Sequence, residues 1–63
     1  MKREADKNRV KRAIEHLNAA KAHLDSIKYA NLEIGDHGNV GITNYDITCC
    51  IRKLNELIKE EEQ

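Results

Sequence analysis

Proline, tryptophan and phenylalanine are absent from this sequence, and tyrosine occurs only twice. Proline interrupts helices more strongly than any other residue, so its absence leaves long helices open throughout the chain. The shortage of aromatic side chains removes the largest contributors to a hydrophobic core. The chain has 63 residues, which is room for one domain, and a domain of this size is marginally stable unless a disulfide, a metal or a partner supports it.

An excess of charge of either sign is also missing, because eleven basic side chains match eleven acidic ones. Domains that bind nucleic acid usually carry a basic excess, so nucleic acid is not the favoured partner. No apolar run approaches the roughly 18 residues that a membrane-spanning helix needs. Charge begins at Lys2 with no apolar stretch behind it, unlike a secretory signal. We therefore expect no membrane partner.

Cysteine occurs only as the adjacent pair Cys49 and Cys50. Neighbouring side chains on a helix point about 100° apart and cannot easily form a disulfide, which favours a reduced, cytoplasmic protein. Cys50 falls on an apolar stripe, as a small core residue would. Two cysteines are too few for a structural zinc site, which needs four ligands. We expect no metal, no cofactor and no catalytic residue.

Apolar residues recur at helical spacing in the first half of the chain. Val10, Leu17 and Leu24 lie seven residues apart, and Ile14 widens this stripe by one position. Such a pattern marks one face of an amphipathic helix. It predicts a first helix from about residue 3 to about residue 29.

A second apolar stripe occupies the last third of the chain. Thr43 and Asp46 have the spacing of a capping box, with Thr43 as the N-cap of a helix. Asn44, one residue later, is an alternative N-cap. These signals predict a second helix from about residue 44 to about residue 61. Its stripe is wider than that of the first helix and comprises Ile47, Cys50, Ile51, Leu54, Leu57 and Ile58.

The predicted connector, from about residue 30 to about residue 42, contains all three glycines. Asp36, His37 and Gly38 are typical of a type I turn in which Gly38 takes the left-handed conformation. One interpretation is two very short strands closed by this turn, and the other is an irregular loop. In both, His37 faces solvent, and Asp36, His37 and Asn39 are the first candidates to contact a ligand or partner. The aliphatic side chains expected to cover the end of the helix pair are Leu32, Ile34, Val40 and Ile42.

The charges at the two ends of the chain predict how the helices pair. The start is mainly basic and the end mainly acidic, so each is unfavourable for the dipole of its own helix. An antiparallel pairing of the helices offsets these unfavourable dipole interactions, because it places the basic start of the chain beside its acidic end. The predicted fold is an all-α hairpin, with or without a minimal β-hairpin in the connector. Two helices alone leave part of their apolar surface exposed to water, so we expect the hairpin to dimerise into a four-helix bundle. The expected oligomer interface comprises Val10, Ile14, Leu17, Leu24, Ile47, Cys50, Ile51, Leu54, Leu57 and Ile58.

These patterns favour a small non-enzymatic protein that associates with itself and binds another protein as a regulator, inhibitor or adaptor. One alternative is a nucleic-acid-binding hairpin dimer that uses the basic start of the first helix. Another is a small-ligand or metal-binding module at the connector. The side chains that would contact phosphate are Lys2, Arg3, Lys7, Arg9, Lys11 and Arg12.

Overall fold

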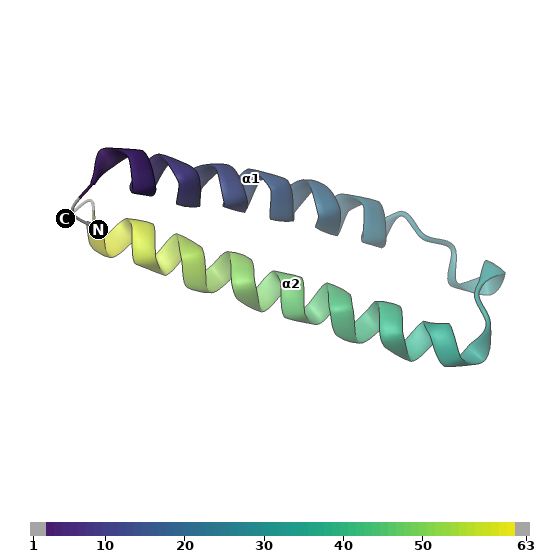
Figure 1. Ribbon diagram of the computed structural model, residues 1–63. Helices are drawn as coiled ribbons and strands as arrows, with labels where there is room; N and C mark the ends of the chain where they lie inside the picture. Colours follow the sequence, from purple (N-terminus) through teal and green to yellow (C-terminus); the bar gives the residue numbers. More distant parts are fainter. Residues whose placement is uncertain (1–2, 62–63) are drawn as a thin grey trace.

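The computed structural model describes residues 3–61, which form an antiparallel hairpin of two helices (Figure 1). Helix α1 spans Glu4–Asp25, a 3-10 turn covers Tyr29–Asn31, and helix α2 spans Ile34–Glu61. No strand occurs among the described residues. The start of α1 lies beside the end of α2 (Figure 1). The prediction of an all-helical antiparallel hairpin is therefore confirmed.

Helix α1 ends at Asp25 rather than near residue 29. The Ser26 hydroxyl donates a 2.7 Å hydrogen bond to the carbonyl oxygen of His23, and such a bond competes with the regular backbone pattern of a helix. The Ser26 N–H is shared between the carbonyl oxygens of Ala22 and His23, each 3.2 Å away. Lys28 is then extended, with φ of −87° and ψ of 108°. The chain therefore leaves the helix at Ser26 and turns towards α2.

Helix α2 begins at Ile34, so the prediction of a non-helical connector up to residue 42 is wrong. The carbonyl oxygen of Glu33 accepts the N–H groups of Asp36 at 2.9 Å and His37 at 3.2 Å, as in the first turn of a helix. No glycine among the described residues has a positive φ, so Gly38 is helical and forms no left-handed turn. Neither the β-hairpin nor the irregular loop is present in this segment.

Packing against α1 explains why α2 continues through its glycines. Val40, Ile47 and Leu54 lie seven residues apart and are all half-buried, so one apolar stripe runs from the glycine segment into the rest of α2. Most of the stability of a helix in a protein comes from such packing, which here outweighs the intrinsic cost of glycine. Thr43 and Asp46 consequently lie inside the helix, both exposed, and do not cap it.

Gly38→Ala is expected to raise the free energy of unfolding by about 0.5–1 kcal/mol. Gly38 has a helical backbone, and a Cβ atom built on it meets no heavy atom within 4 Å. Alanine therefore gains helix propensity without a steric clash. Urea denaturation of the wild type and the variant at one protein concentration measures the change. A loss of stability would show that residue 38 is not helical in solution.

The interior of the hairpin is thin. Ile58, at 8% exposure, is the single buried hydrophobic residue among those described, and none of their side chains is fully buried. The molecule measures 45 × 14 × 13 Å and exposes 5083 Å². A compact monomer of 7.2 kDa would expose about 4,100 Å². The pair of helices thus leaves about 1,000 Å² more surface in water than a compact protein of its mass.

Candidate interaction surfaces

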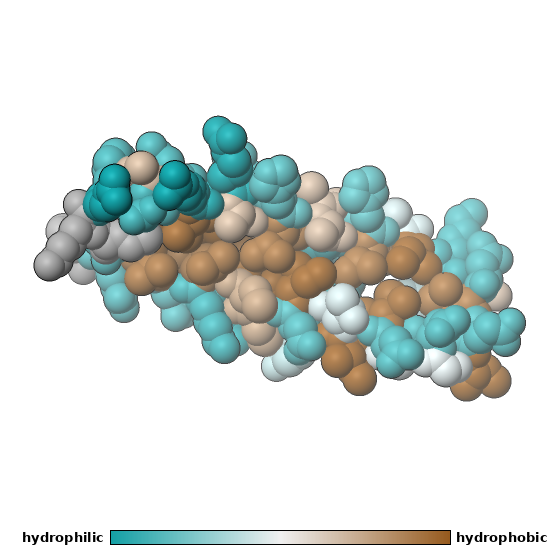
Figure 2. Space-filling view, in the orientation of Figure 1, coloured by the Kyte–Doolittle hydropathy of each residue, from teal (hydrophilic) through white to brown (hydrophobic). Residues whose placement is uncertain are grey.

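One side of the hairpin carries a band of hydrophobic side chains that runs along the boundary between the helices (Figure 2). Residues seven apart share one side of a helix, which groups Ala13 with Ala20 on α1 and Cys50 with Leu57 on α2. Ala13 and Cys50 are exposed, and Leu57 retains 36% exposure. We call this side the apolar flank, and its residues are Ala13, Leu17, Ala20, Leu24, Ile47, Cys50, Leu54 and Leu57.

The ten residues predicted to form the oligomer interface differ in exposure: one is buried, seven are half-buried, and Cys50 and Leu57 are exposed. Ile58 is buried, and most of the others are half-buried between the helices. Cys50 is exposed, so the expectation that it is a small core residue is wrong. It lies at the edge of the helix contact, whereas Cys49 is half-buried beside Arg52, whose Nη2 donates to its Sγ over 3.9 Å. The half-buried members are Val10, Ile14, Leu17, Leu24, Ile47, Ile51 and Leu54.

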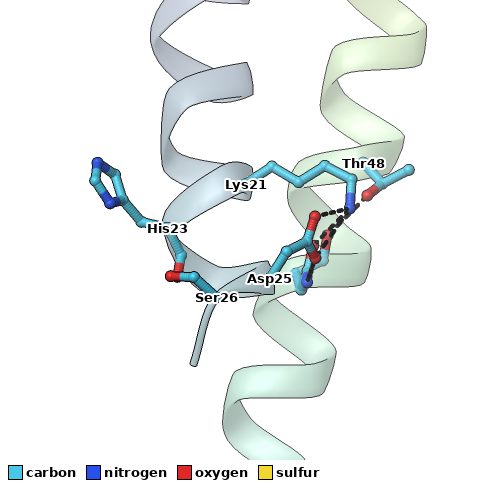
Figure 3. Close-up of polar contacts among 6 residues, drawn as sticks. Lys21, His23, Asp25, Ser26 and Thr48 are labelled. Carbon is cyan, nitrogen blue, oxygen red and sulfur yellow. Dashed lines mark hydrogen bonds and ion pairs between the residues drawn. The ribbon is translucent and has the colours of Figure 1, made fainter. Parts of the chain in front are cut away.

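The opposite side of the hairpin carries a polar cluster that links the two helices (Figure 3). The Lys21 Nζ donates to both carboxylate oxygens of Asp25, at 3.2 and 3.4 Å, and to the Oδ1 of Asn44 at 3.2 Å. The Asn44 Nδ2 donates to the Oδ1 of Asp25 at 2.7 Å. Because these bonds join α1 to α2, they show which residues of the two helices lie opposite each other along the hairpin axis.

The cluster gives Asp25 a perturbed acidity. The hydrogen bond from Asn44 is the largest cause, followed by the one from Lys21, and together they hold the pKa of Asp25 below its ordinary value of 3.8. Both bonds favour the ionised carboxylate. Sequence reasoning placed Asn44 at the start of a helix, and so missed this cluster. Asn44 lies seven residues before Ile51 and therefore on the same side of the helix, which indicates that Asn44 faces α1.

The contribution of Asp25 to stability is expected to depend on pH. Its pKa is lower in the folded chain, so its stabilising effect is present above the ordinary value of 3.8 and is lost as the pH falls through the lowered folded value. Asp25→Asn should therefore be less stable than the wild type at neutral pH, and the difference should shrink below pH 3.8. Urea denaturation across this pH range measures it, and Glu56→Gln, at an exposed position, controls for the change in net charge. A difference that does not vary with pH would contradict the assignment.

A second apolar surface lies on the face of α2 directed away from α1. Ile34 is 90% exposed, Tyr45 68% and Ile42 63%. Ile34 and Tyr45 are eleven residues apart, close to three full turns, so they share one side of the helix, and Ile42 lies beside Tyr45. The expectation that Ile34 and Ile42 cover the end of the helix pair is wrong, because α2 is already helical there and turns both outward. We call Ile34, Ile42 and Tyr45 the outer patch.

The three residues predicted to contact a ligand at the connector do not converge. Asp36 and Asn39 are exposed and share one side of α2, while His37 points about 100° away from Asp36. His37 is half-buried, contrary to the prediction that it faces solvent. Its ring packs against Tyr29, with the centroids 5.4 Å apart and the planes inclined by 54°. In a helix these positions cannot form the turn that the sequence indicated.

The basic residues at the start of α1 are distributed around the helix. The Nη1 of Arg9 forms a 3.0 Å ion pair with Asp6 in its own helix. Lys7 is half-buried, and Lys2 lies outside the described residues. The spacing of the group places its members on several sides of α1 rather than in one stripe. The exposed members are Arg3, Arg9, Lys11 and Arg12.

Within residues 3–61 the structure has no pocket and no group of three or more side chains placed to hold a metal ion. Over the same residues, neither helix has a stretch apolar enough to cross a membrane. No protein-family model, no curated protein and no solved structure matches this chain.

Proposed function

We propose that this chain is a small non-enzymatic interaction protein that associates with itself and binds another protein as a regulator, inhibitor or adaptor. The observation that carries the proposal is the outer patch, where three large apolar side chains of one helix are each at least 63% exposed. Single exposed apolar residues on a surface need no explanation, but these three follow one face of α2 at helical spacing over eleven residues, about 17 Å. An extended helix face with such anchors is a common mode of protein recognition.

Self-association is supported by the thin interior. Among the described residues Ile58 alone is buried, and the hairpin exposes far more surface than a compact protein of its mass. Two hairpins that pack their apolar flanks together form a four-helix bundle with a shared core. The apolar flank follows the boundary between α1 and α2, whereas the outer patch lies on the far side of α2. The two surfaces can therefore be occupied at the same time.

A capture experiment with matched variants tests the proposal. The wild-type chain is immobilised and exposed to an extract of the cells that produce it. The patch variant carries Ile34→Ser and Tyr45→Ser, and the control carries Glu56→Ser and Lys59→Ser at exposed polar positions of the same helix. We expect a protein that binds the wild type and the control and is lost with the patch variant, while circular dichroism shows equal helicity.

Two results would contradict the proposal. One is that every captured protein binds the patch variant as well as the wild type. The other is that capture is abolished by nuclease and by moderate salt, because binding would then run through nucleic acid and the basic start of α1.

A further inference from the structure

We infer that the second copy packs on the apolar flank with its α2 against α1 of the first copy, so that both turns lie at the same end of the bundle. This inference rests on the proposed self-association and adds the relative orientation of the two hairpins. Two twofold arrangements can bring the flanks together. An axis along the hairpin pairs α1 with α2 of the other copy, and an axis across the hairpin pairs α1 with α1 and α2 with α2.

The sizes of the side chains favour the pairing of α1 with α2. Both helices carry large side chains where they contact each other. At the outer positions of the flank, α1 has only the small residues Ala13 and Ala20, whereas α2 has Leu57 as well as the small Cys50. The distance between packed helices is about 8–10 Å and depends on the side chains at the contact. Pairing α1 with α1 would need a short distance between the two helix axes, and pairing α2 with α2 would need a long one. Pairing α1 with α2 makes both distances equal and lets small residues face large ones.

The charges beside the flank favour the same arrangement. Helical spacing places Arg9 along the outer edge of the flank on α1. It places Asp46 and Glu60, with Lys53 between them, along the edge of the flank on α2. Pairing α1 with α2 brings Arg9 of each copy over the end of α2 that carries Glu60 in the other copy. The alternative places the α2 edge, with its two acidic side chains and one basic side chain, over the same edge of the other copy. Complementary charge of this sort selects orientation more than it adds affinity.

The alignment of α1 and α2 along the long axis of the hairpin agrees with this charge pairing. Asn44 bonds both Lys21 and Asp25, so it lies level with about residue 23 of α1. Counting outward along the antiparallel pair places Glu60 within one turn of Arg9. A twofold axis along the hairpin does not shift one copy along the other, so Glu60 and Arg9 also lie within one turn of each other across the interface.

The hairpin as a whole exposes enough excess surface to accommodate a second copy. A stable interface buries about 800 Å² on each partner. The hairpin exposes about 1,000 Å² more than a compact protein of its mass. One further hairpin on the apolar flank is therefore enough to bring the exposed surface into the ordinary range.

Distances between spin labels test the orientation. The label is attached at Ala30→Cys, in the turn, or at Ala19→Cys, near the middle of the hairpin, each in a chain that also carries Cys49→Ser and Cys50→Ala. Ala19 and Ala30 are both exposed, so the label does not disturb the helix contact. We expect both sites to give separations set by the width of the bundle and well below the 45 Å length of the hairpin. The Ala19 label serves as the matched control, because it gives a short separation in either arrangement.

Each other outcome has a distinct meaning. A short separation at Ala19 with a separation near 45 Å at Ala30 would overturn the inferred orientation and leave self-association intact. No measurable coupling at either site, with the mass of a single chain, would overturn both the orientation and the proposed self-association.

Discussion

Leu54→Ala is expected to lower the free energy of unfolding by about 2–5 kcal/mol. Leu54 lies well inside α2, half-buried between the helices and on the apolar flank. In the proposed dimer the second copy also covers Leu54, so the shorter side chain loses contact with the other helix and leaves a cavity in the shared core. A loss of this size is a large fraction of the stability of any small domain. Urea denaturation measures it at a fixed protein concentration, because the stability of a dimer depends on concentration.

Glu56→Ala is the matched control for this prediction. Glu56 is exposed on the same helix, only two residues from Leu54, so its truncation should change the free energy of unfolding by less than about 0.5 kcal/mol. Similar losses for the two variants would mean that the assignment of the buried face of α2 is wrong.

Leu57→Glu is expected to raise the dimer dissociation constant at least tenfold, which corresponds to about 1.4 kcal/mol. Leu57 is 36% exposed in the single hairpin, so the hairpin itself tolerates a polar side chain there. In the proposed dimer the same position lies between the two flanks, where an unpaired carboxylate would lose its hydration. Sedimentation equilibrium over a range of concentrations measures the dissociation constant.

Asn55→Glu adds the same charge on the other side of α2 and is the control. Asn55 is exposed and lies towards the side that carries Lys21, Asp25 and Asn44. The Asn55→Glu substitution should leave the dissociation constant within a factor of about two of the wild-type value, because surface substitutions usually have small effects. Equal weakening by both variants would mean that the copies do not meet on the apolar flank.

The helical hairpin could be predicted from periodicity because that signal is strong where apolar residues recur without interruption. Val10, Leu17 and Leu24 define the contact face of α1, and Leu54 and Ile58 define that of α2. The end of α1 was harder to predict, since it depends on the Ser26 hydroxyl, which bonds to the carbonyl oxygen of His23. A local side-chain bond of this kind leaves no periodic trace in the sequence.

The start of α2 was placed too late because local signals competed with a longer-range one. Three glycines and the capping-box spacing of Thr43 and Asp46 indicated a connector. The spacing of seven that links Val40 to Ile47 indicated a continuous helix, and packing against α1 decided in its favour. Intrinsic propensity is a weak guide where tertiary contacts are available.

The candidate surfaces could be predicted only in part. The apolar flank follows from the same stripes that predict the helices. The outer patch does not, because Ile34 and Ile42 project from α2 only if the glycine segment is helical. The cluster of Lys21, Asp25 and Asn44 depends on how the two helices align, which the sequence of either helix alone does not specify.

Self-association is the central claim, and light scattering at tens of micromolar tests it most directly. The thin interior and the exposed apolar flank predict a mass of about twice 7.2 kDa or more, with a melting temperature that rises with protein concentration. A single species of 7.2 kDa that melts cooperatively at a temperature independent of concentration would contradict the account.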